Sequence, residues 1–535
     1  MKKSFIKILA IVLVPCSLLL SSCKDYLTEI EPGTDLIEDF YTSTDAAIQN
    51  VTACYVPLMW EYNNTYYSEW FFGDILSDDA LKGGGSTKDM SDAYDFENWR
   101  TTSGNTLVKD FYRAQYQGIA RCNLALQYVG DMKVGIDANF TAEMKARLLA
   151  EAYYLRAYYY FRLVRLFAGV PLVLKVVDSS DDWGQPRASV DEVFTQILAD
   201  LTIAEQDLWK KSAYDAADLG RATKGAAQAM LMKVNLYMAS PYWQTYSLSK
   251  SAAECYADAK TWGKKVIDSG EYDLCPVFED NFTLEGENGI ESIFEIQYAE
   301  VPWGDYGEGN GFTAGSFTQQ LIRSRSSLIG GGWGFNHPSQ NLYDEFEAGD
   351  PRRDVAIFVP DEAMMENKAE EIYLGNKLLN NKYGMYRDTY TGTGIGQWGL
   401  HASRGPLNNR QIRYADVLLM YAEACLESGD AATAKTYINK VRARVGLGEV
   451  EATEATLRHE RRCELAMEGH RWFDIVRWDI AEQTMKAYEA GESDLYKDQI
   501  ALGSGFKKGK HEIMPIPYDE ILLNPTKMEQ NPNYN

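Results

Sequence analysis

The sequence is short of proline and of positive charge, and it contains a single long apolar run. With 16 prolines in 535 residues and 45% hydrophobic residues, the composition excludes a disordered chain. The 53 Lys and Arg residues face 77 Asp and Glu residues, a net charge of −24. Such an acidic chain repels a phosphate backbone, which excludes nucleic-acid binding as its main activity.

Sequence motifs for metals and nucleotides are also missing. The six cysteines after Cys23 show no CxxC or other close spacing, which argues against a zinc site. Disulfides among these cysteines are permitted outside the cytoplasm. Most of the six lie in apolar helical patterns, however, so we expect buried free thiols at Cys54, Cys122, Cys255, Cys275, Cys425 and Cys463. The GxGxxG string at 394–399 lacks a preceding strand, which excludes a dinucleotide site there. We expect no cofactor. A bound Ca²⁺ is compatible with the acidic composition, but the sequence contains no recognisable Ca²⁺-binding loop.

The first 22 residues have the features of an export signal. Three early lysines precede an apolar run over 8–20, which is too short to span a bilayer but fits the hydrophobic region of a signal peptide. The run ends in Leu-Ser-Ser-Cys at 20–23, which resembles a bacterial lipobox. The sequence therefore predicts a signal peptide over 1–22 and lipid attachment at Cys23, with an ordinary signal peptide as the alternative.

Helical periodicity dominates the rest of the chain. Apolar residues at 148–166 step by three or four on two faces, which is typical of a helix packed between others. Small and large residues over 418–441 have the spacing of a tetratricopeptide helix pair, and 226–267 form a looser pair. Residues 271–408 are instead rich in Gly and aromatics, apart from a strand pattern at 292–298. We predict a mostly α, tetratricopeptide-like helical scaffold with a large irregular, loop-rich ligand-binding part.

The charged segment 458–477 (RHERRCELAMEGHRWFDIVR) is interpreted as structural. Glu460, Glu464 and Glu468 step by four between arginines, a pattern that supports a helix through ion pairs along its surface. Trp472 and Trp478 fall in helical patterns and are expected in the core.

Ordered sequence blocks resemble the RagB/SusD family of outer-membrane nutrient-binding lipoproteins of Bacteroidetes. Cys463 and Met467 depart slightly from the family pattern. The blocks are Ser22–Leu27, Glu151–Ala157, Leu166–Val173, Pro186–Val193, Gly220–Ala227, Asp350–Arg353, Arg413–Leu419, Glu460–Asp474, Met514–Pro517 and Asn531–Tyr534.

This resemblance implies an N-terminal helical part over 23–240 and a C-terminal part over 241–535, with irregular loops at 271–408 and tetratricopeptide-like helices at 410–480. It also implies a non-enzymatic, cell-surface lipoprotein of the outer membrane that captures oligo- or polysaccharide. The partner it implies is a SusC-like TonB-dependent transporter, over which the protein sits as a hinged lid. Acidic residues after Cys23 resemble a surface-export signal; these are Asp25, Glu29 and Glu31.

Two alternatives remain open. A binder of peptide or another nutrient on the same scaffold would show strands and charges at its site rather than Trp platforms. A surface glycoside hydrolase would use paired carboxylates such as Asp78 and Asp79, although acids in a loop more often cap it or face solvent.

Ligand-binding residues are predicted from sugar chemistry. Sugars present flat apolar faces and hydroxyls, so a site needs exposed aromatic platforms beside amides, carboxylates or Arg. Aromatics in Gly-rich loops fit this need, although each Trp has loop packing as its alternative. The candidates are Asp78, Asp79, Asn98, Trp99 and Arg100; Trp303, Asp305 and Tyr306; Trp333, Phe335 and Asn336; and Trp398.

Overall fold

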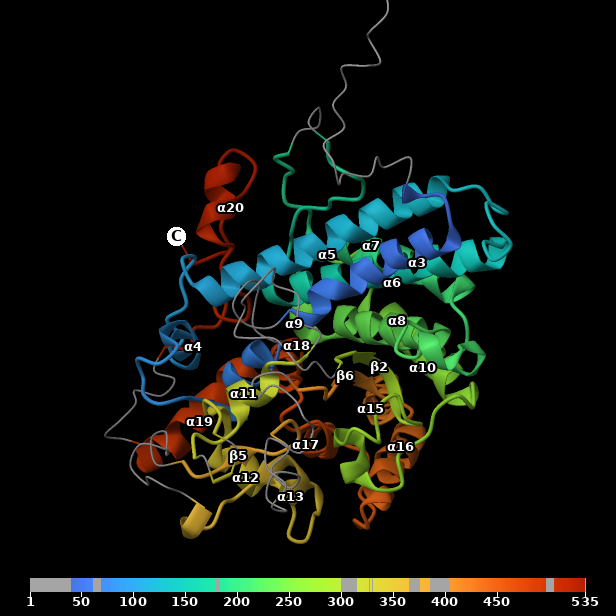
Figure 1. Cartoon of the computed structure of the whole chain (residues 1–535). Coiled ribbons are helices and arrows are strands. Elements are labelled where there is room, and N and C mark those ends of the chain that lie inside the picture. The colour runs from blue at the N-terminus through green and yellow to red at the C-terminus, as the bar shows by residue number, and fades with distance from the viewer. Residues whose placement is uncertain are drawn as a thin grey trace, which may run out of the picture.

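The structure is a computed structural model that describes residues 40–60, 69–178, 183–299, 315–326, 328–329, 331–364, 376–384, 405–496 and 505–534. Its architecture is mostly α, as predicted (Figure 1). The helices used below are α3 (Thr44–Tyr55), α4 (Ser91–Glu97), α5 (Thr106–Asp131), α6 (Ala142–Phe167), α7 (Val190–Asp207), α8 (Lys224–Ala239), α10 (Ala252–Asp268), α11 (Thr318–Ile322), α12 (Gln340–Glu345), α13 (Arg352–Ala356), α15 (Tyr414–Glu427), α16 (Ala431–Arg444), α17 (Glu454–Glu464), α18 (Arg471–Arg477), α19 (Ala481–Tyr496) and α20 (Tyr518–Leu523).

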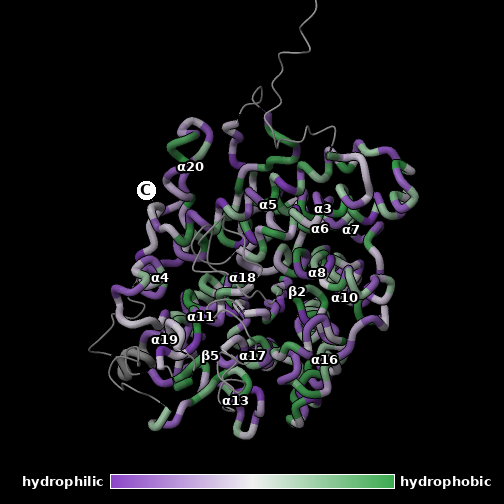
Figure 2. The backbone as a smooth tube through the Cα atoms, in the orientation of Figure 1, coloured by the Kyte–Doolittle hydropathy of each residue, from purple (hydrophilic) through white to green (hydrophobic). Residues whose placement is uncertain are grey.

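The long helices form one stacked array. Each of α5, α6, α7, α8, α10, α15 and α16 packs on the next in the series, and α3 packs on α5 (Figure 1). The array follows from the sequence because α8 is buried on every face, whereas the outer helix α5 alternates polar and apolar residues (Figure 2). The two helix pairs predicted at 226–267 and 418–441 are confirmed as α8 with α10 and α15 with α16.

Helix α5 approaches α6 closely at a glycine. A Cβ atom built on Gly118 would lie 2.3 Å from the ring of Tyr159, so only glycine leaves room for this ring. The Tyr159 hydroxyl in turn donates to the backbone carbonyl of Cys54 in α3 at 2.7 Å. One residue without a side chain therefore lets three helices meet.

Among the residues that the structure describes, three two-stranded antiparallel ribbons hold the irregular part, and each joins segments distant in the sequence. Strand β2 (Ser292–Ile296) confirms the predicted strand and pairs with β6 (Asn409–Arg413). Strand β1 (Ala80–Gly83) pairs with β3 (Phe335–Pro338), with Leu81 opposite His337. The third ribbon joins β4 (Ile357–Phe358) to β5 (Leu379–Asn380).

Helix α17 is structural, as predicted, but Glu460 and Glu464 do not pair with the arginines of their own helix. Glu460 and Glu464 are fully buried and bind arginines from other elements, because α17 lies inside the C-terminal half. Glu464 accepts hydrogen bonds from Arg352, Arg413 and Arg444 at 3.1, 3.0 and 2.5 Å. The helix is thus the centre of a buried ion-pair network that joins α13, β6 and α16.

The cysteines and tryptophans follow the predicted pattern where the structure describes them. The six cysteines after Cys23 are free thiols, five of them buried and Cys275 half-buried. Trp472 and Trp478 are buried in the core. Within the described ranges, no helix is both long and apolar enough to cross a bilayer.

Candidate ligand-binding face

Asp78 and Asp79 lie in the interior rather than in an open loop. Asp78 binds Arg471 (Oδ1–Nε 2.7 Å) and Arg462 (Oδ2–Nη2 3.0 Å), and Asp79 binds Nε of Arg462 at 2.8 Å. Burial alone would raise the pKa of Asp78, but Arg462 and Arg471 outweigh it and hold that pKa well below its usual value. Both carboxylates form ion pairs with guanidinium groups inside the protein. The prediction that they face a ligand is therefore wrong.

The predicted platform at Trp99 is buried as well. Its ring lies 5.0 Å from Trp472, 5.0 Å from Phe506 and 5.6 Å from His511, and the side chain is 5% exposed. The backbone of Trp99 adopts φ +56°, which turns the ring into the core. Because both faces of the indole are packed, Trp99 offers no surface on which a sugar could stack.

The neighbours of Trp99 divide between interior and surface. Asn98 is buried, and its side-chain amide donates to the Tyr94 carbonyl at 2.9 Å. Arg100 is exposed, forms an ion pair with Asp95 at 3.3 Å and lies 5.0 Å from the Tyr94 ring. Of the first predicted cluster, Arg100 alone remains open to solvent.

Phe335 and Asn336 lie in the β1–β3 ribbon, and both side chains are buried. Phe335 is 1% exposed and stands opposite Gly83 in the ribbon. The Asn336 amide donates to Asp74 at 3.0 Å, and burial raises the pKa of that carboxyl to about 7. Alternation along a strand puts neighbouring residues on opposite faces, yet here both faces are covered.

Trp333 remains accessible at the start of this ribbon. Its half-buried ring packs edge-on against Phe317 with centroids 5.2 Å apart. The exposed Arg325 side chain lies against the backbone of Gly334 and reaches Gly85, and its Nη1 is 3.8 Å from Oδ2 of Asp89. These groups, Trp333, Arg325, Asp89 and Gly85, form what we name the β1–β3 face.

Arg325 was not among the sequence candidates. The sequence feature that could have identified it is its position shortly before Trp333, in a segment (RSRSS) that alternates Arg and Ser and precedes three glycines. A cation near a tryptophan in the sequence of a Gly-rich segment meets the same chemical criterion that singled out Trp333. Trp303, Asp305, Tyr306 and Trp398, like Cys23, lie outside the described residues and stay predictions.

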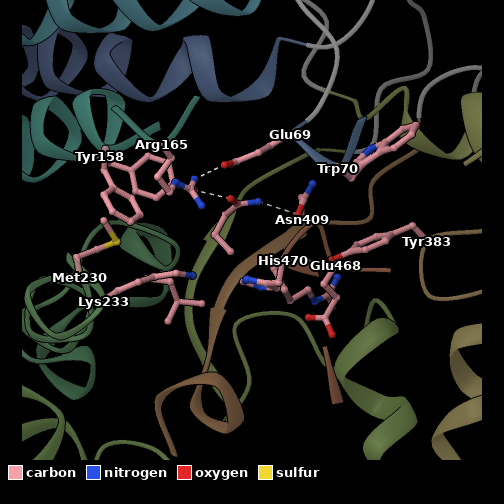
Figure 3. A pocket seen from close by; sticks show the side chains of 15 residues that line it. Glu69, Trp70, Tyr158, Arg165, Met230, Lys233, Tyr383, Asn409, Glu468 and His470 are labelled. Atoms are coloured by element: carbon pink, nitrogen blue, oxygen red, sulfur yellow. Dashed lines mark hydrogen bonds and ion pairs between the residues drawn. The ribbon is translucent and has the colours of Figure 1, made fainter. Parts of the chain in front are cut away.

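A central cavity lies between α6, α8 and β6, where Glu69 and Arg165 point toward one another and form an ion pair (Figure 3). Lys233 and His470 add further polar lining. Burial, and then the nearby Lys233 ammonium group, lower the pKa of His470 to about 4, so its ring is neutral near pH 7. The free space is about 30 Å³, which suits a water molecule rather than a sugar ring.

An apolar hollow of about 220 Å³ lies beside α3, with Tyr55, Met59 and Leu219 in its wall and Arg221 and Gln297 at its edge. This volume is below the range of typical ligand pockets, about 300–1,000 Å³. Among the residues that the structure describes, no group of three or more His, Cys, Asp or Glu side chains is arranged to hold a metal ion. The β1–β3 face is therefore the candidate that best matches the predicted chemistry.

Comparison with known proteins bears on both halves of the chain. A family model described as "Starch-binding associating with outer membrane" matches 25–236, and the model of the SusD family matches 284–534. The SusD-like protein P38 of Formosa agariphila is 27% identical over 549 residues, which cover 96% of each chain.

Solved structures agree with these matches. A laminarin binding SusD-like protein superposes with a TM-score of 0.76 at 28% identity, covering 92% of this chain and 99% of that one. Surface glycan-binding protein A from Bacteroides uniformis gives 0.75 at 26% identity, covering 91% and 99%. The sequence blocks, the helical array and these matches agree along nearly the whole chain, and the protein belongs to the SusD/RagB family.

Proposed function

We propose that this protein is a glycan-binding protein of the outer membrane rather than an enzyme. The observation that carries the proposal is the likeness, over more than nine-tenths of the chain, to relatives that are named as binders of laminarin and of surface glycans. The helical array supplies a rigid support, and function in such arrays belongs to the surfaces they display.

The β1–β3 face is the proposed binding surface. Trp333 supplies an aromatic ring whose inner edge is fixed by Phe317, so little conformational entropy is lost when a sugar stacks on it. Arg325, which lies against Gly334 next to Trp333 in the chain, and Asp89 supply charged hydrogen-bonding groups. Trp303, Asp305, Tyr306, Trp398 and the exposed Arg100 stay predicted contributors.

The test is a titration of the full mature chain with laminarin and a panel of other polysaccharides. We expect Trp333→Ala to weaken binding of the cognate glycan by about tenfold or more, because the stacking surface is lost. Arg325→Ala should weaken it less, since its charge is solvent-screened. Calorimetry measures both, and the thermal unfolding of each variant shows whether it is folded.

Trp183→Ala is the control, since Trp183 is 73% exposed on a loop beside α20 and outside the β1–β3 face. It should bind like the wild type. A Trp333→Ala protein that binds every glycan of the panel as the wild type does would remove this face from consideration. New reducing ends released from the panel would instead support the hydrolase alternative.

Membrane attachment through Cys23 and delivery of the glycan to a SusC-like TonB-dependent transporter complete the proposal. We expect Cys23→Ala to move the protein from the membrane fraction to the soluble fraction, because acyl chains on this residue would be its anchor. Fractionation of cells, with labelled fatty acid as the tracer, measures both anchoring and acylation. A Cys23→Ala protein that stays in the membrane fraction and still takes up label would contradict the assignment.

A further inference from the structure

A lysine-lined groove lies where α8, α10 and α15 meet the segment before α8. Its free volume is about 580 Å³, within the range of small-ligand sites. Two acidic residues, Asp268 and Glu271, also line it, against six lysines: Lys210, Lys211, Lys224, Lys260, Lys264 and Lys265. In a chain with 77 acidic and 53 basic residues, this groove has the opposite charge balance to the whole.

Three of these lysines form no ion pair with an acidic side chain that the structure describes. Lys210, Lys224 and Lys260 form no ion pair with any residue in the described part of the chain, although the Lys224 ammonium donates to the carbonyl of Gln206 at 3.5 Å. Lys264 binds Asp268 at 2.8 Å. Free ammonium groups gathered around a hollow repel one another, which makes an anionic occupant favourable.

The remaining charges of the groove are already engaged. Lys211 turns inward and donates to the carbonyls of Gly289 and Ser292 at 2.5 and 2.9 Å. Lys265 lies 3.7 Å from Glu205. Glu271 accepts from the backbone and hydroxyl of Ser212 at 2.8 and 2.9 Å. The bonds of Lys211 and Glu271 go to neutral groups, so their opposite charges remain and attract one another. The net positive charge of the groove is therefore that of Lys210, Lys224 and Lys260, of which Lys260 also attracts Asp430.

Two buried tyrosines and several neutral polar groups also line the groove. Tyr272 and Tyr421 line it, and a Cβ atom on Gly225 would lie 2.4 Å from the Tyr272 hydroxyl, so the ring fills the space left by this glycine. Gln228 and Thr261 add an amide and a hydroxyl to the lining. The first turn of α8, at Lys224 and Gly225, adds the partial positive charge of a helix N-terminus.

We propose that this groove is a second binding site, for an oligosaccharide that carries carboxylate groups. The amide and hydroxyl groups of the lining suit the hydroxyl groups of sugars, and the three lysines without an ion pair suit the carboxylates. A concave groove of this volume can hold a short chain of sugars, whereas an acidic protein partner would need a larger and flatter contact surface. Figure 1 places α10 on the opposite side of the molecule from α4 and α11, so the site is separate from the β1–β3 face.

The experiment is a titration of the full mature chain with an oligogalacturonate and with its methyl-esterified, uncharged counterpart. The oligogalacturonate binds and the ester does not, and affinity falls as salt is raised, since the attraction is screened. Combining Lys210→Ala, Lys224→Ala and Lys260→Ala lowers affinity by about tenfold or more, and arginine at the same three positions retains it.

A charge-matched control removes three lysines elsewhere, at Lys435, Lys486 and Lys508, each of which is exposed and paired with a neighbouring acid. Its affinity stays that of the wild type. The proposal is overturned if oligogalacturonate does not bind or if the ester binds equally well. It is also overturned if the alanine variant of the groove and the control variant lose the same affinity. Binding of polyglutamate without oligogalacturonate likewise overturns it, in favour of an acidic protein partner. Laminarin binding, measured in the same variants, reports on the β1–β3 face independently.

Discussion

Glu464→Gln is expected to lower the free energy of unfolding by about 3–5 kcal/mol, the cost of breaking a buried ion pair from one side. The substitution keeps the shape of the side chain but removes the charge that three buried guanidinium groups share. Those groups, on Arg352, Arg413 and Arg444, lie within 3.1 Å of the carboxylate. Their other acidic partners, among them Glu291, would have to neutralise them alone. Urea unfolding followed by circular dichroism measures the loss.

Glu454→Gln in the same helix is the matched control. Its carboxylate is 60% exposed and binds Arg458 at 2.8 Å, so its removal should change the free energy of unfolding by less than about 1 kcal/mol. If the two substitutions destabilise the protein equally, the buried network does not hold the C-terminal half together in the way described.

The same network sets the response to acid. Burial would raise the pKa of Glu468, but Arg413 and Lys382 outweigh burial and lower it to about 2. The pKa of Glu464 is also lowered, by Arg444 and Arg413 against the effect of burial. A carboxyl whose pKa is depressed by folding stabilises the protein above its unfolded pKa, 4.5 here, and this stability is lost as pH falls toward the folded pKa. The difference in the free energy of unfolding between Glu464→Gln and the wild type should therefore become smaller below pH 4.5.

Trp99→Ala is expected to cost about 3–5 kcal/mol of stability, as is typical when a large buried ring is deleted. The sequence alone predicts the opposite outcome, weakened glycan binding without loss of fold. The structure reverses this because Trp472, Phe506 and His511 surround the ring. Thermal unfolding measures the loss, and a glycan titration well below the melting temperature tests whether the folded fraction still binds.

Trp333→Ala supplies the comparison, since its half-buried ring contributes less to the core. We expect the larger stability loss from Trp99→Ala and the larger affinity loss from Trp333→Ala. A Trp99→Ala protein with unchanged stability and no glycan binding would restore Trp99 as a ligand platform.

The helical scaffold was readable from the sequence because its signals are local. The apolar steps of α6 and the small and large residues of α15 and α16 lie close together along the chain, within a few helical turns. Each of these patterns encodes its own element whatever packs against it. The free thiols followed for the same reason, since their burial was part of the helical pattern.

The candidate site was less readable because its geometry depends on distant partners. Asp79 and Arg462 are 383 residues apart, and nothing near the aspartate signals that its charge is already neutralised. The glycines beside Trp99 and Trp333 suggested open loops. In the structure Gly83, Gly84, Gly331 and Gly334 have positive φ angles at the ends of the β1–β3 ribbon and bring the chain back into the core. Composition therefore indicated which segments form the candidate site, but it could not indicate which of their side chains are exposed.

The pairing of β1 with β3 also affects when the ligand face can form. Ala80 stands opposite Pro338, so the ribbon closes a loop that contains most of the helical array. Contacts of such long range are slow to form, since the entropy of the intervening chain must be lost before they stabilise anything. A chain released before residue 338 would fold its N-terminal helices yet have no binding face. We therefore expect the β1–β3 face to form late in folding, after the N-terminal helices have packed.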